Sequence, residues 1–415
     1  MKKIISFTLT ILVFFSLIPF NLAAAKDSPP AVSADSAIVM DAATRTILYN
    51  KNIDAAYPPA STTKLMTALL TLEKCKLDDV VKIGKKPPLA DGSKIYIFED
   101  EELTVNDLLH GLLLSSANDC AEALAEHIGG SIEGFAKLMN EKAKKLGCEN
   151  ANFMNPSGLY HNNHKASSKD LALIMRELSK HDEYIKIATT LSYNIQPTSK
   201  SKESRPLWNE NKLIQKNSKY YYEGCIGGKT GYTIQSKHSY VCAVTRNNQT
   251  LIVALVHDEK KTFWEDSTNL LNYCFKNYEL ATLYSKGQEV TSYSKNDLKF
   301  PLSAAEDFFY VKEKGTNPLV KYEIKDKDIS KLSFKKGDKL LDAEVTLDGK
   351  SIGLLKLSSG IDHEIKAVSK VVNATKNNIL RILSILCYTA AAIVLLLLIL
   401  KKIIKYKKKK RKYRV

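Results

Sequence analysis

Residues 59–67 carry the most informative local pattern of the chain, Pro59-Ala-Ser-Thr-Thr-Lys-Leu-Met-Thr67. Ser61 and Lys64 are three residues apart at the start of a predicted helix over 61–74, so their side chains share one face. A deprotonated lysine there can take the serine proton, and the helix N-terminus favours the developing negative charge. In this lysine-rich chain the same spacing also begins at Ser199, Ser292 and Ser333. Taken alone, the pattern is more typical of a capping serine followed by a surface lysine.

Two further motifs follow in the sequence. Ser116-Ala-Asn118 interrupts helical patterns over 104–114 and 119–128, so its side chains can project from a turn. Lys229-Thr-Gly231 is the only such tripeptide in the chain, and it lies at a strand entry, where glycine lets a ligand approach the backbone. An ordinary helix break and a simple turn also explain these motifs singly. All three in this order are typical of enzymes that acylate a serine.

With these motifs, the sequence resembles the low-molecular-weight penicillin-binding proteins that act as serine-type D-Ala-D-Ala carboxypeptidases. The resemblance covers residues 33–365. Besides residues 59–67, it is carried by Leu112-Leu-Leu-Ser-Ser-Ala-Asn-Asp119, Asn155-Pro-Ser-Gly-Leu159 with His164 and Asp170-Leu-Ala, and Gly228-Lys-Thr-Gly-Tyr-Thr233. Residues 301–307 and 347–353 resemble the C-terminal domain of this family. The implied fold class is α/β, a β-lactamase/transpeptidase-like sheet covered by helices and followed by a small all-β domain.

The resemblance also implies roles for single residues. Ser61 corresponds to the acylated nucleophile, Lys64 to its general base and Ser116 to a proton relay. The residues that correspond to the substrate-binding set are Asn118, which orients the substrate amide, and Lys229, Thr230 and Gly231, where the terminal carboxylate of a peptide or β-lactam is held. The backbone N–H groups of Ser61 and Tyr232 correspond to the oxyanion hole, which can contribute several kcal/mol. The family pattern includes no metal and no cofactor.

The chain departs from the family pattern at two places. Ser236-Lys-His238 stands where many members have Ala-Gly, and Asn209-Glu-Asn211 has a glutamate where some members have an arginine. No arginine can be assigned as a clamp for the ligand carboxylate. These departures affect the expected substrate preference and rate rather than the nucleophile. His164 and Asp170 match family positions that we expect to be structural, orienting a loop and capping a helix.

Periodicity indicates how the chain is organised between its ends. A hairpin is expected over 36–54, helices over 131–146, 168–180 and 263–278, and paired strands over 240–245 and 250–256. Central helices with strands on both sides in the sequence predict a sheet assembled from distant segments and covered by helices. We expect a catalytic domain over 26–282 and a β domain over 283–370, with a tight hairpin at Asp348-Gly349.

The two ends predict export and anchoring. Residues 1–25 have the pattern of a signal peptide, with a basic start, an apolar run and the small residues Ala23-Ala-Ala25 at the end. The alternative is an uncleaved N-terminal anchor. Residues 382–400 lack charge and would span about 28 Å as a helix, which suits a transmembrane segment. The basic tail over 401–415 should stay cytoplasmic. The predicted location is therefore the cell membrane, with one span and the catalytic domain on the cell-wall side.

Charge and cysteine content narrow the class of protein further. The chain has 61 basic and 45 acidic residues, a net charge of +16. Most of the excess lies at the two ends, in Lys2, Lys3, Arg381 and residues 401–415, so a nucleic-acid binder is not expected. The seven cysteines form no Cys-x-x-Cys pair and have no zinc-like histidine spacing. We expect mostly free, buried thiols.

The leading hypothesis is a penicillin-binding carboxypeptidase that removes the terminal D-alanine from peptidoglycan pentapeptide stems. A β-lactamase characteristically adds a glutamate that activates the deacylating water, and we find no Glu-x-x-Leu-Asn loop between Asn118 and Lys229. A transpeptidase and a non-catalytic wall-binding scaffold on the same fold remain as alternatives. The expected partners are the stem peptide, β-lactams as inhibitors and the membrane.

Overall fold

The structure is a computed structural model that describes residues 28–325 and 327–411. The expected signal peptide over 1–25 lies outside the described residues, as does the end of the basic tail. The chain forms two compact units, one up to Leu280 together with Val311–Thr316, and one of Ala281–Tyr310 together with the chain from Asn317 onward. Each unit has its own hydrophobic core.

A five-stranded antiparallel sheet organises the first unit, in the order β2-β1-β11-β10-β9. It joins distant segments of the chain, as expected. Its strands are β1 (Ser36–Asp41), β2 (Ile47–Lys51), β9 (Cys225–Thr233), β10 (Lys237–Arg246) and β11 (Gln249–Asp258). Ile38 of β1 lies opposite Ala254 of β11. The motif Lys229-Thr-Gly231 therefore belongs to an edge strand, open on one side to other groups.

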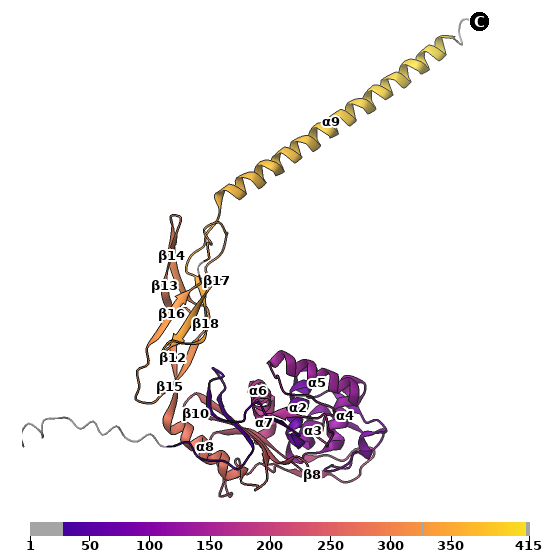
Figure 1. Cartoon of the computed structure of the whole chain (residues 1–415). Coiled ribbons are helices and arrows are strands. Elements are labelled where there is room, and N and C mark those ends of the chain that lie inside the picture. The colour runs from indigo at the N-terminus through magenta and orange to yellow at the C-terminus, as the bar shows by residue number, and fades with distance from the viewer. Residues whose placement is uncertain (1–27, 326, 412–415) are drawn as a thin grey trace, which may run out of the picture. The chain divides into compact units, whose positions relative to one another are not determined.

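Helices cover both faces of this sheet (Figure 1). Successive strand residues point to opposite faces, so Ile252 packs among the helices of one layer and Val253 among those of the other. The first layer contains α2 (Lys64–Lys74), α3 (Val105–Leu114), α4 (Asn118–Gly129), α5 (Ile132–Leu146), α6 (Ser168–Leu178) and α7 (Asp182–Thr189), and α8 (Phe263–Asn277) covers the opposite face. Because both faces of the sheet are covered, every residue of β1 is buried, and the strand shows no alternation of buried and exposed side chains.

Short elements connect this framework. Three short antiparallel pairs lie outside the main sheet. They are β3 (Ala56–Tyr57) with β6 (Ala166–Ser167), β4 (Val80–Lys82) with β5 (Glu102–Thr104), and β7 (Ser192–Ile195) with β8 (Arg205–Trp208). The 3-10 helix η2 covers Pro87–Leu89. Capping boxes begin α3, with Thr104 and Asp107, and α6, with Ser167 and Asp170. The expectation that Asp170 caps a helix is thus confirmed.

The start of the first helix differs from the prediction. Residues Ala60–Thr63 form the 3-10 helix η1, and the α-helix α2 begins only at Lys64. Ala60 adopts a positive φ of 49°, so an α-helix cannot include this residue. In a 3-10 turn, side chains at i and i+3 eclipse each other. Ser61 and Lys64 therefore still share one face, although not for the reason that the pattern suggested.

The second unit is built on another antiparallel sheet, in the order β13-β14-β18-β17-β16. Its strands are β13 (Glu289–Lys295), β14 (Leu298–Ala304), β16 (Val320–Ile324), β17 (Lys339–Leu347) and β18 (Lys350–Ser359). Strands β12 (Tyr278–Tyr284) and β15 (Phe308–Glu313) form a separate pair. The predicted tight hairpin joins β17 to β18, with positive φ at Asp348 and Gly349.

The long helix α9 (Lys366–Arg411) follows this sheet (Figure 1). Its segment Thr375–Lys409 is long and apolar enough to cross a membrane and includes the predicted span over 382–400. The α/β fold class, with its helix-covered sheet, small all-β part and C-terminal apolar helix, is confirmed.

All seven cysteines are free, and the four buried ones are Cys120, Cys225, Cys242 and Cys274.

Candidate active site

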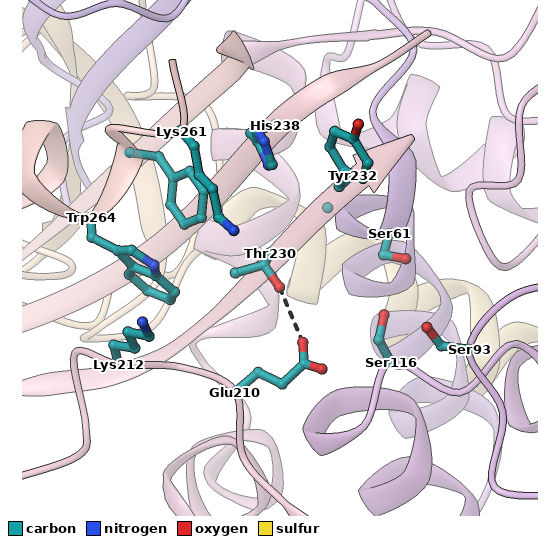
Figure 2. Close-up of a pocket in the computed structure, with 12 residues that line it drawn as sticks. Ser61, Ser93, Ser116, Glu210, Lys212, Thr230, Tyr232, His238, Lys261 and Trp264 are labelled. Atoms are coloured by element: carbon teal, nitrogen blue, oxygen red, sulfur yellow. Dashed lines mark hydrogen bonds between the residues drawn. The ribbon is translucent and has the colours of Figure 1, made fainter. Parts of the chain in front are cut away.

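The three sequence motifs meet beside the edge strand β9. A pocket of about 640 Å³ opens there, and Figure 2 shows its side chains. Its lining residues are Ser61, Ser93, Ser116, Glu210, Lys212, Thr230, Gly231, Tyr232, His238, Lys261, Phe263 and Trp264. Five of the predicted site residues are in this lining. The other three, Lys64, Asn118 and Lys229, are buried.

Lys64 is the most unusual group of the site, because its side chain is completely buried. Its Nζ lies 2.9 Å from Oγ of Ser61, 2.6 Å from Oδ1 of Asn118 and 2.7 Å from the carbonyl oxygen of Ser157. Burial, and then the positive charge of Lys229, hold the pKa of Lys64 well below that of an ordinary lysine. An uncharged amine has two N–H groups for the two carbonyl-type oxygens and keeps its lone pair for the hydroxyl of Ser61. The arrangement therefore fits a base directed at Ser61.

Backbone groups of the segment 90–101 hold Asn118 in place. The backbone N–H of Asn118 donates to the carbonyl oxygen of Ser93 at 2.6 Å, and its Nδ2 donates to that of Asp91 at 2.5 Å. Because the side-chain amide is used in this way, its oxygen is directed at Lys64. Ser116, two residues earlier, has a φ of 55°, a conformation that a non-glycine residue seldom adopts and that is common at functional sites.

The loop between Met154 and His164 holds the Ser157 carbonyl that contacts Lys64. His164 is almost fully buried, and its Nδ1 accepts a hydrogen bond from the backbone N–H of Met154. The proton of the neutral ring is therefore on Nε2, which donates to Oγ1 of Thr63 at 2.9 Å. Burial lowers the pKa of His164 to about 4, which keeps the ring neutral. Gly158 has a φ of +86°, and a Cβ there would lie 1.8 Å from the carbonyl oxygen of Ala60. These contacts fix the segment that presents the Ser157 carbonyl, so His164 orients a loop as expected.

The Lys-Thr-Gly motif provides a buried cation and a close backbone approach. Nζ of Lys229 donates to the carbonyl oxygen of Thr230 at 3.0 Å, and burial lowers the pKa of Lys229 to about 8. At neutral pH this side chain is therefore still mostly charged. A Cβ at Gly231 would lie 2.9 Å from the backbone N of Ser61. Glycine is thus needed where β9 passes Ser61, directly before Tyr232, whose N–H was expected in the oxyanion hole.

Comparison with known proteins agrees with this geometry. A family model described as D-alanyl-D-alanine carboxypeptidase matches residues 23–260, and one described as the C-terminal domain of penicillin-binding protein 5 matches residues 278–365. The chain belongs to the D-alanyl-D-alanine carboxypeptidase family. The resemblance inferred from the sequence motifs is confirmed, and with it the class of serine-type peptidase.

Individual relatives of this carboxypeptidase family cover most of the chain. D-alanyl-D-alanine carboxypeptidase DacF of Bacillus subtilis is 34% identical over 367 residues, 84% of this chain and 91% of that protein. Penicillin binding protein 5 from Haemophilus influenzae has a similar structure, with a TM-score of 0.69 and 29% identity over 81% of this chain and 99% of that chain. The DD-transpeptidase of Streptomyces K15 matches 60% of this chain and 99% of its own, with a TM-score of 0.56 and 28% identity.

Several pocket residues of this carboxypeptidase were missed by the sequence reasoning. Ser93, Lys212, Lys261, Phe263 and Trp264 line the pocket without belonging to any of the three motifs. In the structure, buried and exposed residues alternate after Trp208, which puts Lys212 on the same side as Glu210, but the run Asn209-Glu-Asn-Lys212 has no apolar alternation that could have predicted this. Glu210 and His238, noticed only as departures from the family pattern, also line it. No arginine is among the described residues that line this pocket.

Proposed function

We propose that this chain removes the terminal D-alanine from peptidoglycan pentapeptide stems through an acyl-enzyme formed on Ser61. The single observation that carries the proposal is the buried amine of Lys64, placed within hydrogen-bond distance of Ser61, Asn118 and Ser157. A buried lysine without a carboxylate partner is costly unless it is uncharged, and an uncharged amine at this position is a base for the serine.

The proposed reaction has two steps. Lys64 takes the proton of Ser61 while Oγ attacks the carbonyl carbon of the D-Ala-D-Ala bond, and the N–H groups of Ser61 and Tyr232 hold the resulting oxyanion. The carbon–nitrogen bond then breaks, and Lys64 and Ser116 return a proton to the leaving D-alanine. In the second step, water attacks the ester, its proton passes to Lys64, and Ser61 leaves as the hydroxyl.

The remaining site residues bind the substrate. The amide of Asn118 orients the peptide on the acyl side, and Thr230 and the cation of Lys229 hold the terminal carboxylate beside the close approach at Gly231. A β-lactam offers the same carboxylate and a strained amide, so it acylates Ser61 as an inhibitor. Membership of a penicillin-binding family supports both the peptidoglycan substrate and β-lactam binding.

We also propose the membrane topology. The apolar segment Thr375–Lys409 supports anchoring through α9. The catalytic unit would face the cell wall, where the stem peptides are, and the lysine-rich end of the chain would remain in the cytoplasm.

Fluorescent penicillin labelling tests the function directly. We expect Ser61→Ala to abolish labelling and the release of D-alanine from diacetyl-L-Lys-D-Ala-D-Ala. Ser199→Ala, Ser292→Ala and Ser333→Ala are matched controls, since none of these serines begins a helix in the structure. Peptide mapping by mass spectrometry should place the penicilloyl group on Ser61. A wild-type protein that binds no penicillin and releases no D-alanine would instead support the wall-binding scaffold.

A further inference from the structure

We propose that Glu210 determines specificity by ligand charge, because its carboxylate contacts the hydroxyl of Thr230 that is proposed to bind the ligand carboxylate. This inference rests on the proposed function, in which Thr230 and Lys229 hold that carboxylate. Figure 2 shows Glu210 directed at Thr230, with Ser61, Ser93 and Ser116 on one side and Lys212, Lys261 and Trp264 on the other.

The backbone around Glu210 is held by its two neighbours. Asn209 and Asn211 are buried, and the side chain of Asn209 donates to the carbonyl oxygens of Ala188 and Thr190 at 2.9 Å. Oδ1 of Asn211 accepts from the hydroxyl of Tyr240 at 2.8 Å. Because buried and exposed residues alternate here, fixing both asparagines directs Glu210 and Lys212 into the pocket. The position of the carboxylate is thus set by the fold.

The contact of Glu210 with Thr230 is close but weak. Oγ1 of Thr230 donates to Oε2 of Glu210 over 3.5 Å, which is long for an O–H···O hydrogen bond. A ligand carboxylate at normal distance would form the stronger bond and displace it. The two carboxylates would then lie side by side, which costs free energy because like charges repel.

Glu210 acts on the cations of the site at a distance rather than through a direct ion pair. Among the described residues, no ion pair within 4.0 Å joins Glu210 to a cation, although Lys212 and Lys261 line the same pocket. The negative charge of Glu210 raises the pKa of Lys229 and that of Lys64. In the free protein, Glu210 therefore supplies part of the counter-charge that a ligand carboxylate would otherwise provide. We infer that Glu210 weakens the binding of anionic ligands, relative to neutral and cationic ones, without abolishing the attraction of Lys229 for a carboxylate.

A series of three β-lactams that share one ring system and carry a negative, neutral or positive substituent at the carboxylate position tests this inference: benzylpenicillin, its carboxamide and its aminoethyl amide. Acylation rates are measured by intact-protein mass spectrometry on the detergent-solubilised full chain. Glu210→Gln should raise the rate with benzylpenicillin about three- to ten-fold, as expected for two unit charges roughly 5 Å apart in a hydrated pocket. The rate with the carboxamide should not change, and the rate with the aminoethyl amide should fall.

Two further variants separate charge from structure. Lys212→Met removes a cation from the same segment, so it should lower the rate with benzylpenicillin, raise that with the aminoethyl amide and leave that with the carboxamide unchanged. Glu203→Gln removes an exposed carboxylate outside the pocket and should change none of them.

The possible failures are distinguishable. If Glu210→Gln changes all three rates by the same factor, or lowers the rate with benzylpenicillin, the inference is wrong while the proposed function stands. If benzylpenicillin acylates neither the wild type nor the variant, the proposed function fails as well.

Discussion

Lys64 donates to the backbone carbonyl of Ser157 over 2.7 Å, although the two residues are 93 positions apart in the sequence. This contact gives the buried amine a second fixed acceptor besides Asn118. With both of its N–H groups used, an uncharged amine has its lone pair left for Ser61. The carbonyl of Ser157 thus orients the proposed base.

The first prediction concerns the pH dependence of acylation. The lowered pKa of Lys64 makes the uncharged base available at a lower pH than in an ordinary lysine, so the rate should rise along a limb well below pH 10.5. The pKa of Lys229 is about 8, and loss of its charge removes the partner of the ligand carboxylate. The rate should therefore fall again above about pH 8. The measurement is the acylation rate by benzylpenicillin from about pH 6 to 10.

Lys64→Arg provides the matched variant for this profile. Arginine keeps the charge but cannot release its proton, so we expect almost no acylation at any pH in this range. A variant that acylates at nearly the wild-type rate would remove Lys64 from the role of base. A wild-type rate that only rises up to pH 10 would instead contradict the role of the Lys229 cation.

The second prediction concerns stability in acid. His164 has a folded pKa of about 4, below the usual value near 6.5, because burial disfavours its charged form. The unfolded chain therefore binds the proton first, and stability is lost as the pH falls from about 6.5 towards 4. The full effect is roughly 3 kcal/mol for this one group. His164→Gln should be less stable at pH 7, by about 1–3 kcal/mol for the disturbed buried hydrogen bonds, but should lose less stability over the same pH range.

Thermal unfolding of both proteins between pH 7 and 4 measures this difference. The exposed His127 provides the control, since His127→Gln should leave the pH dependence unchanged. Parallel curves for the wild type and His164→Gln would show that other groups cause the acid sensitivity.

The sequence predicted which motifs come together at the site better than it predicted the structure that supports them. Ser61, Asn118 and Lys229 belong to motifs in which side-chain type and spacing are informative, and the structure brings these residues together; their catalytic roles remain proposals. The Ser157 carbonyl could not be predicted, because every residue has a backbone carbonyl and only the folded loop shows which one is used. Lys261 and Trp264 were missed for a related reason, since their place in the pocket depends on how the chain leaves β11.

Sequence periodicity predicted the overall fold but not its local details. Periodicity predicted a helix-covered sheet made from distant segments because both cores leave a strong apolar pattern. It did not predict η1, because the positive φ before it belongs to Ala60, and an alanine gives no sequence signal for that conformation. The departure at Glu210 was visible in the sequence, but only the contact with Thr230 gave it a physical meaning.

The third prediction concerns the ion pair that supports segment 90–101. Nη2 of Arg205 lies 2.9 Å from the carboxylate of Glu101, and the Glu101 side chain is fully buried. Arg205→Met leaves that carboxylate uncompensated and should cost about 3–5 kcal/mol. Glu101→Gln combined with Arg205→Met should cost less than the sum of the single changes. Because this segment holds Asn118, the variant should also raise KM for the peptide.

A double-mutant cycle in chemical denaturation measures the coupling. Lys82 and Asp100 form the matched control, an exposed ion pair in the same region, and changing them to Met and Asn should have no measurable effect. Equal costs for the two pairs would contradict the argument from burial.

The fourth prediction concerns the membrane anchor. Large apolar side chains are exposed along α9 from Ile379 to Ile404, far more than a soluble helix leaves in water. A chain that ends at Ile365 retains every strand of both sheets and loses α9. We expect this shortened protein to appear in the soluble fraction and still to bind fluorescent penicillin, whereas the full chain should need detergent for extraction.

Protease treatment of intact cells tests on which side of the membrane each part of the chain lies. In the proposed topology the catalytic unit is digested from outside, while a tag placed after Val415 is protected until the membrane is opened. The lysine-rich end supports this direction, because moving so many positive charges across a bilayer is unfavourable. Retention of the shortened protein in the membrane fraction would point to a second anchor at the N-terminus. Digestion of the tag in intact cells would reverse the proposed orientation of α9.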